Sequence, residues 1–242
     1  MKYFITIVVL LCLSCPSWAT WGVVQHMIGS AACTSANQTC NLPVSSTGNN
    51  DLIIVGLVIA ANGEYITAIS DGGSSYVVNS GALAGNACAG QDASPLGSDC
   101  GYTLSSVSGK TSITVTRTDA TSHIWRVSAT EYSFSAASIA FDVVGKRDQS
   151  SNCTSCAGVA LTLTGTNDAI YQIDASGLPS AITTYSSADF AAHIGAASLI
   201  NTNSGTAPTW TQSNNPSALS AIAFKEVTGS GTLRRRAMVI QE

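Results

Sequence analysis

The chain has 242 residues, of which 45% are hydrophobic and only 10% are charged, and its formal net charge is −4. This hydrophobic content is enough for the core of one large domain or two small ones. The mild acidity argues against a nucleic acid as partner, because phosphate binding requires clustered lysines and arginines. The one basic cluster, Arg234–Arg236, lies near the end of the chain.

Residues 1–19 predict a secretory signal peptide. Lys2 supplies the positive start, residues 4–13 are apolar, and small residues precede the expected cleavage site after Ala19. The apolar run is too short for a membrane-spanning helix, and no later run is long enough to cross a bilayer. We therefore expect an exported chain that is secreted or held at the cell surface. Attachment of a lipid at Cys15 stays an alternative.

Alternation of β-branched and polar residues dominates the rest of the chain. In residues 111–118, Ile113, Val115 and Arg117 share one face while serine and threonine occupy the other, which predicts a half-buried strand. The near-continuous apolar run at 51–60 predicts a strand buried on both faces. Similar patterns predict further strands at 64–70, 74–78, 122–134, 138–144, 158–165 and 218–227.

Two segments depart from simple alternation. Trp125 and Val127 share one face of their strand, but the next large residue, Tyr132, lies on the other, so we expect a bulge or a twist near Thr130. Residues 188–194 fit one short helix, because a serine precedes them as N-cap and a glycine follows them. The same residues also fit a strand.

The fold expected from these elements is an all-β antiparallel sandwich, jelly-roll-like, with at most one short helix. Turns rich in Gly, Asn, Asp and Ser separate the strands at intervals of about ten residues, as in sandwiches and barrels. We assign the sandwich to residues 20–227 and a flexible basic tail to residues 228–242. Residues 48–60 resemble residues 165–177, since both contain an Asn-Asp turn before an apolar run, which hints at an internal duplication.

Three segments carry a resemblance to known sequences. They are the apolar run at 51–60, the Asp71–Tyr76 turn that ends in an aromatic residue, and the Thr130–Tyr132 element. With these, residues 21–226 resemble a group of uncharacterised secreted bacterial β-sandwich domains from environmental sequences. The resemblance implies a sandwich fold and export, and it implies no activity.

Six cysteines follow the signal peptide, and an even number in an exported chain predicts disulfides. They form three close pairs within turn-like sequence, so we favour pairing between neighbours. Cys153 and Cys156 form a C-x-x-C, which would also fit a redox couple or half of a zinc site. Neither a βαβ pattern nor a second ligand pair accompanies it, so a disulfide is favoured. The expected pairs are Cys33–Cys40, Cys88–Cys100 and Cys153–Cys156.

No catalytic constellation stands out. The chain lacks G-x-S-x-G, and His26, His123 and His193 are scattered along it. The best single acid for a polysaccharide hydrolase is Glu131, which would need a second carboxylate across a cleft. We favour a structural interpretation, with Glu131 at the sandwich rim or paired with Arg126.

Trp210 and Trp21 are the candidate ligand-binding residues, because an aromatic ring on a loop or sheet face can stack on a sugar. Packing at a strand end is the competing interpretation. Asp71, Asp92 and Asp99 are loop acids of the kind that bind calcium, but they lack EF-hand spacing, so we expect no cofactor and keep a bound calcium ion as the less favoured alternative.

The sequence therefore predicts a non-catalytic, secreted or cell-surface module that binds a glycan or cell-surface polymer, or is adhesive. A secreted polysaccharide hydrolase is the first alternative. A structural component of an extracellular assembly is the second, and it would self-associate.

Overall fold

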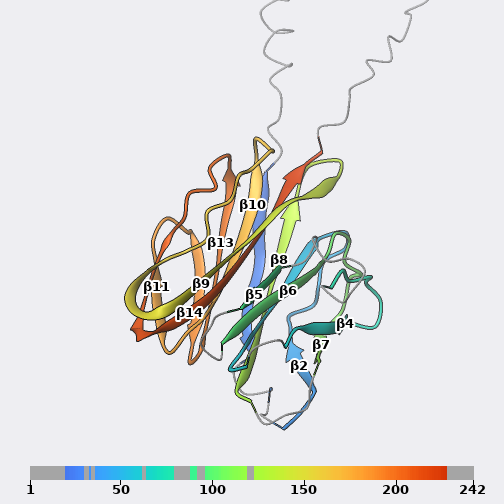
Figure 1. Cartoon of the computed structure of the whole chain (residues 1–242). Helices are drawn as coiled ribbons and strands as arrows, with labels where there is room; N and C mark the ends of the chain where they lie inside the picture. The colour runs from blue at the N-terminus through green and yellow to red at the C-terminus, as the bar shows by residue number, and fades with distance from the viewer. Residues whose placement is uncertain are drawn as a thin grey trace, which may run out of the picture.

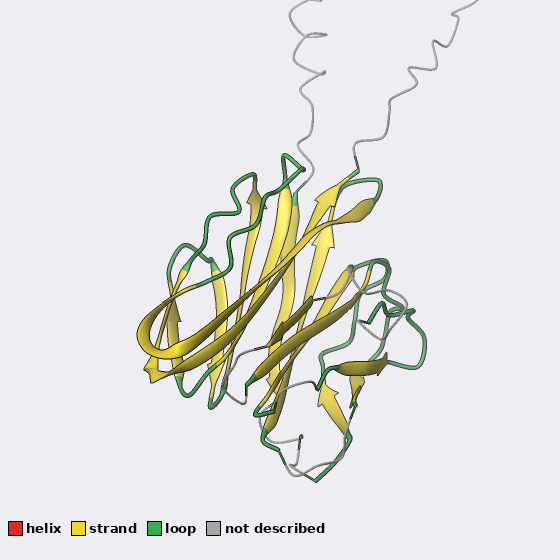
Figure 2. Cartoon of the chain, viewed as in Figure 1, coloured by secondary structure: helices red, strands yellow, loops and turns green. Residues whose placement is uncertain are grey.

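The computed structural model of the chain describes residues 20–29, 33, 36–61, 64–78, 88–91, 96–118 and 123–227, with backbone alone at 88–91. The predicted signal peptide and the basic tail lie outside these residues. The described residues form strands and no helix (Figure 2). This confirms the predicted all-β antiparallel sandwich.

Five strands form the first large sheet. Their order is β1-β8-β3-β6-β5, and every neighbouring pair is antiparallel. These strands are β1 (Trp21–Gly29), β3 (Leu52–Ile59), β5 (Cys88–Gln91), β6 (Gly97–Thr103) and β8 (Trp125–Phe134).

Six strands form the second large sheet, in the order β11-β14-β10-β13-β12, with β9 paired to β14. The β9 and β14 strands make one long twisted ribbon (Figure 1). The strands are β9 (Ile139–Ala157), β10 (Asp168–Ala175), β11 (Pro179–Ile182), β12 (Ser187–Ala191), β13 (Ile194–Thr202) and β14 (Thr209–Glu226).

A small third sheet covers part of the first. It has the order β2-β7-β4 and contains β2 (Thr39–Pro43), β7 (Ser112–Arg117) and β4 (Ile66–Ser70). As predicted for a half-buried strand, Ile113, Val115 and Arg117 of β7 are buried while the residues between them are more exposed.

Three hydrophobic clusters hold these layers together. The central cluster lies between the two large sheets and includes Leu52, Tyr132 and Tyr171. A second cluster joins the first large sheet to the small sheet, and a third covers the outer face of the second large sheet. As a result, β3 and β10 are buried at every position, which explains the continuous apolar run at 51–60.

Burial on both faces also explains the pattern in β8. Trp125 and Val127 pack toward the small sheet, whereas Tyr132 packs toward the second large sheet. The alternation of β8 is therefore regular, and its pairing with β3 has no register shift. The predicted bulge near Thr130 is wrong; the shift lies in the partner strand β1, between Val23 and Gln25.

Three predicted elements differ from the structure. The predicted strand at 74–78 is reduced to an isolated bridge between Val77 and Tyr102. The predicted helix at 188–194 is wrong, because these residues form β12, a turn with His193 at φ 74°, and the start of β13. The predicted strand at 158–165 is also irregular. Its alternation still reflects burial, since Val159 and Leu161 are buried and cover the second large sheet. Alternating burial does not require a hydrogen-bonded ladder.

The two large sheets share one topology. In chain order, the first half contributes β1, β3, β5, β6 and β8, and the second contributes β9, β10, β12, β13 and β14, apart from the short edge strand β11, which has no counterpart in the first sheet. In both sheets the spatial order is first, fifth, second, fourth, third. This identity supports the internal duplication that the resemblance of residues 48–60 to residues 165–177 suggested, because these segments lead into the equivalent strands β3 and β10.

The register of the two sheets agrees as well. Leu52 lies opposite Tyr132 in the first sheet, and Ala169 lies opposite Phe224 in the second. In each sheet the first strand contains one extra, unpaired residue, next to the aromatic residue of the fifth strand. The pairing register of β1 passes from Val23 directly to Gln25, and the register of β9 shifts in the same way at the equivalent place. A shared bulge makes chance similarity of topology a poor explanation.

Candidate functional site

Both tryptophans predicted to bind ligand lie in the interior. Trp210 is 0% exposed and packs edge-on against Phe190, with ring centroids 6.3 Å apart. Trp21 is 3% exposed and packs against Phe134 at 5.6 Å. Neither indole presents a face to solvent, so their burial favours the packing interpretation.

Two of the three predicted disulfides are confirmed. Cys33 bonds to Cys40 and Cys153 bonds to Cys156. The third prediction is met at the level of the backbone, where β5 places Cys88 opposite Cys100. Cys100 is disulfide-bonded, but the side chain of Cys88 lies outside the described residues.

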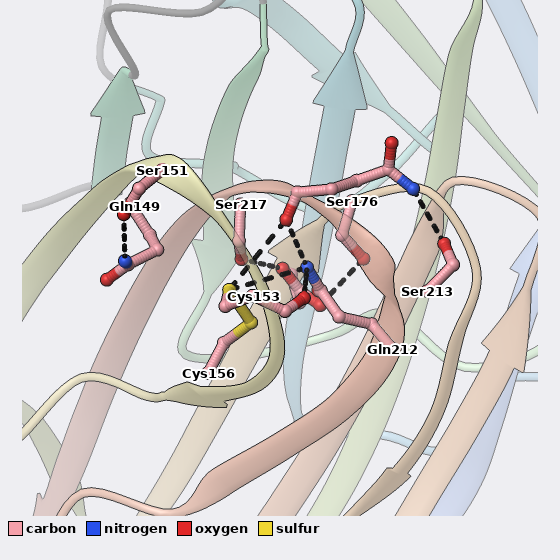
Figure 3. Close-up of a disulfide and its surroundings, with 10 residues drawn as sticks. Gln149, Ser151, Cys153, Cys156, Ser176, Gln212, Ser213 and Ser217 are labelled. Carbon is pink, nitrogen blue, oxygen red and sulfur yellow. Dashed lines mark hydrogen bonds between the residues drawn. A yellow bond between two sulfur atoms is a disulfide. The ribbon is translucent and has the colours of Figure 1, made fainter.

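The C-x-x-C disulfide lies within β9, where the ribbon with β14 is irregular (Figure 3). The Nε2 of Gln212 donates to the backbone oxygens of Cys153, at 3.3 Å, and of Asn215, at 2.9 Å. A redox-active pair usually gains a low thiol pKa from a helix N-terminus, and this pair lies in a strand. The position favours a structural disulfide.

The predicted calcium ligands are occupied by protein donors. Asp71 accepts from the backbone N–H of Gly73 and Ser74, and Asp99 accepts from the N–H of Ile66 and Cys100. Asp92 lies outside the described residues. Among the described residues, no three or more His, Cys, Asp and Glu side chains form a group that could hold a metal. Nor do the described residues include a helix with the length and apolar character that crossing a bilayer requires.

The three histidines lie apart. The Nδ1 of His26 is 2.6 Å from Asp189 and ties β1 to β12. His123 is 3.7 Å from Glu64, and His193 forms the turn between β12 and β13. Burial lowers the pKa of His26, although Asp189 opposes the shift, and its Nε2 has no hydrogen-bond partner in the described part of the chain. This leaves His26 without a nucleophile to activate.

A pocket of about 450 Å³ opens beside the connection from β8 to β9. Three segments line it: Asn49–Asp51 before β3, Leu104 and Ser105 after β6, and Phe134 with Ala136–Ile139. The hydroxyl of Ser105 donates to the Oδ1 of Asn50 at 2.9 Å. The pocket thus combines amide, hydroxyl and carboxyl groups with one aromatic ring.

Two neighbouring carboxyl groups, those of Asp51 and Glu131, lie at this pocket, and Asp51 is the one that lines it. Glu131 is 2% exposed, and its carboxylate accepts from the N–H of Gly48 at 2.7 Å and from Gln25. Arg126, its predicted partner, donates instead to the backbone oxygen of Trp125. Burial, and then the neighbouring charge of Glu131, raise the pKa of Asp51 to about 6. Asp51, the acid that lines the pocket, is therefore mostly ionised at pH 7 and half protonated near pH 6.

Comparison of the chain with protein-family models, curated proteins and solved structures gave no match. The resemblance to secreted bacterial sandwich domains stays a prediction. The site must be argued from this chain's own geometry.

Sequence reasoning missed the pocket, whose polar side chains are Asn49, Asn50, Asp51, Ser105 and Ser138. A signal existed in the Gly-Asn-Asn-Asp turn, which recurs as Gly-Thr-Asn-Asp at 165–168. The sequence does not reveal that β6 and the β8–β9 connection end beside this turn.

Proposed function

We propose that the chain is an exported, non-catalytic binding module that holds the end of a glycan in this pocket. The observation that carries the proposal is the pocket itself, which places Asn49, Asn50 and Ser105 near the ring of Phe134. Sugars need such a mixture, because their hydroxyls bind amide and hydroxyl groups while their apolar ring faces pack on aromatic rings.

The size and charge of the pocket narrow the ligand. Its volume of about 450 Å³ falls in the range of about 300–1,000 Å³ that is usual for small-molecule sites. None of the described residues that line it is a lysine or arginine. The ligand that fits this lining is a neutral sugar, since an acidic sugar would lack a counter-charge and meet Asp51.

Export is supported by two independent features. The first 19 residues have the pattern of a signal peptide. Disulfides such as Cys33–Cys40 and Cys153–Cys156 persist in oxidising compartments and are rare in the cytosol. Detection of the chain in the medium or at the cell surface, cleaved after Ala19, tests this part of the proposal.

A glycan array on the purified exported chain tests the binding function. We expect a set of related neutral glycans to bind, and Asn49→Ala to weaken that binding at least tenfold. Asn214→Ala is the matched control, because Asn214 lies in the irregular part of β14 and outside the pocket. Absence of any bound glycan, or equal binding by Asn49→Ala, would contradict the proposal.

A polysaccharide hydrolase is the second candidate, and one observation favours it. Asp51 lines the pocket with a pKa of about 6 beside the buried Glu131, which is the kind of tuning that a general acid needs. A reducing-end assay on glycans that bind the array separates the two functions. Release of new ends that Asp51→Asn abolishes would replace binding by hydrolysis.

The third function, a component of an extracellular assembly, predicts self-association. Light scattering of the purified chain measures it directly. A stable multimer would favour the assembly over a binding module that acts as a single chain.

A further inference from the structure

The pocket has a counterpart in the other half of the sandwich, and there the space is filled by Trp21. The equivalence begins at the turns before β3 and β10. A Cβ at Gly48 would overlap the carboxylate of Asp51, and a Cβ at Gly165 would overlap that of Asp168. Both turns therefore fold the aspartate back onto a glycine, which no other residue could replace without displacing it.

The strands beside these turns match too. Ile53 pairs with Thr103, and the backbone oxygen of Asp51 accepts from the backbone N–H of Ser106. In the other half Ile170 pairs with Leu199 and Asp168 pairs with Thr202. In each half, the chain at the end of the fourth strand has two residues between these two pairs, whereas the second strand has only one. The second of the two is Ser105 in the first half and Asn201 in the second half.

The first strands of the two halves begin in the same way. The N–H of Ser135 donates to the oxygen of Thr20, and the N–H of Val227 donates to the oxygen of Ser138. Trp21 follows Thr20 and Ile139 follows Ser138. Together with the shared bulge of β1 and β9, this makes Ile139 the counterpart of Trp21.

Contacts between the sheets show that the halves face each other with an approximate two-fold relation. The hydroxyl of Tyr132 on β8 lies 2.6 Å from the hydroxyl of Ser198 on β13. The equivalent contact, with the two halves exchanged, joins Phe224 on β14 to Tyr102 on β6. Their rings pack edge to face, with centroids 4.7 Å apart. Equivalent residues of the two halves therefore meet across the interface with their roles exchanged.

Trp21 shows how such a position is filled. Its indole Nε1 donates to the backbone oxygen of Asn167 at 3.0 Å. Its backbone N–H donates to the Oδ1 of Asn201 at 2.8 Å, and its backbone oxygen accepts from the Nδ2 of Asn201 at 3.1 Å. The ring is 3% exposed, so this half of the sandwich is closed by its own side chain.

The pocket repeats this arrangement with smaller residues. Asn50 stands in the place of Asn167, Ser105 in the place of Asn201, and Ile139 in the place of Trp21. An isoleucine lacks the two rings of an indole, and a serine is shorter than an asparagine. The pocket of about 450 Å³ is left open between the turn and the β8–β9 connection, so it has room for a ring.

We propose that this open space is a seat for one six-membered ring from outside the chain, in the position that mirrors the indole of Trp21. The choice of a sugar ring rests on the proposed function, so the ligand is the terminal neutral pyranose of a glycan. Ile139 and Phe134 contact the ring, and Asn49, Asn50 and Ser105 bind its hydroxyls.

The decisive variant fills the seat from within. Ile139→Trp restores the residue that the other half carries and should abolish glycan binding, with at least a tenfold loss on the array. Leu178→Trp is the matched control and should keep binding, because it adds an indole at an exposed position outside the pocket. Ala137→Trp fills the pocket from an exposed position and serves if Ile139→Trp fails to fold.

A second measurement separates this inference from the proposed function. Titration of ¹⁵N-labelled protein with methyl pyranosides should shift the amide signals of Asn49, Asn50 and Ser105, and Ile139→Trp should remove the shifts. If the array shows binding that Ile139→Trp and Ala137→Trp both retain, the seat is wrong and the glycan-binding function stands. If the array is empty but these shifts occur, the seat stands and the proposed function fails. Absence of both signals overturns both.

Discussion

Tyr132 of β8 and Ser198 of β13 are joined by a hydrogen bond of 2.6 Å between their hydroxyl groups, across the interface of the two large sheets. Both residues are 0% exposed. A polar link at the centre of a hydrophobic interface stabilises the fold only as long as both groups are satisfied. It therefore fixes the relative position of the two sheets more strictly than apolar packing does.

Tyr132→Phe tests this link. The change leaves the hydroxyl of Ser198 buried without this partner, so we expect the free energy of unfolding to fall by about 1–3 kcal/mol. Chemical denaturation measures the loss. Tyr132→Phe combined with Ser198→Ala should cost less than the sum of the single changes, because no buried group is then left unsatisfied. Additive costs would show that the two hydroxyls are not coupled.

Arg117 and Glu64 form an ion pair under the small sheet, with Nη1 and Oε2 2.7 Å apart and the arginine side chain 0% exposed. The guanidinium also lies 5.0 Å from the ring centroid of Trp125. Glu64→Gln removes the negative charge beside a buried cation, so we expect a loss of about 3–5 kcal/mol in thermal or chemical unfolding.

The double change of Arg117→Met and Glu64→Leu is the control for this pair. It removes both charges and fills the same space with apolar atoms, so it should recover most of the stability. A double variant that is less stable than Glu64→Gln would mean that the pair contributes net stability of its own.

The fold class could be predicted because burial leaves a pattern in the sequence: alternation where one face is buried, as in β7, and a continuous apolar run where both faces are buried, as in β3. The prediction failed where a helix and a strand fit the same sequence pattern. Residues 187–191 have the composition of a short helix, but pairing with β13 makes them a strand. Such pairing depends on residues distant in the chain, which local propensity does not register.

The candidate site was harder to predict for the same reason. Trp21 and Trp210 are conspicuous in the sequence, yet both are buried by strands that come from elsewhere in the chain. The pocket is open because position 139 carries an isoleucine and not a tryptophan. This difference becomes visible only when the two halves are superposed in space. The duplicated turns at 48–51 and 165–168 were the one local clue.

Buried carboxyl groups predict that the protein loses stability as the pH rises. Burial raises the pKa of Asp99 to about 8, although hydrogen bonds from the N–H of Ile66 and Cys100 oppose the shift. Burial and the neighbouring Asp142 raise the pKa of Asp168 to about 7. In the unfolded chain such groups titrate near pH 4, so between about pH 4 and 8 the folded state binds protons that the unfolded state lacks.

The sign of the effect follows from this difference. The stability from a raised pKa is fully present below about pH 4 and is lost as the pH rises through the folded value. We expect the free energy of unfolding to fall between about pH 4 and 8, with a smaller slope in Asp99→Asn. Asp71→Asn is the control, because hydrogen bonds from Ser74 and Gly73 lower the pKa of Asp71 despite burial, and it is ionised throughout this range. A stability that rises with pH across this range would contradict the assignment.

The disulfide between Cys153 and Cys156 should contribute stability and leave ligand binding unchanged. It closes a loop with a sequence separation of only 3, so its removal by Cys153→Ser with Cys156→Ser should cost about 2 kcal/mol or less by the loop-entropy estimate. The disulfide touches Gln212 and Asn215 of β14, whereas the pocket is lined by other segments. We therefore expect a lower melting temperature and an unchanged pattern on the glycan array. Removal of Cys33–Cys40, which closes a longer loop with a separation of 7, should cost more. Loss of an enzymatic or binding activity in the Cys153 and Cys156 variant at a temperature where it is folded would instead assign a functional role to the C-x-x-C.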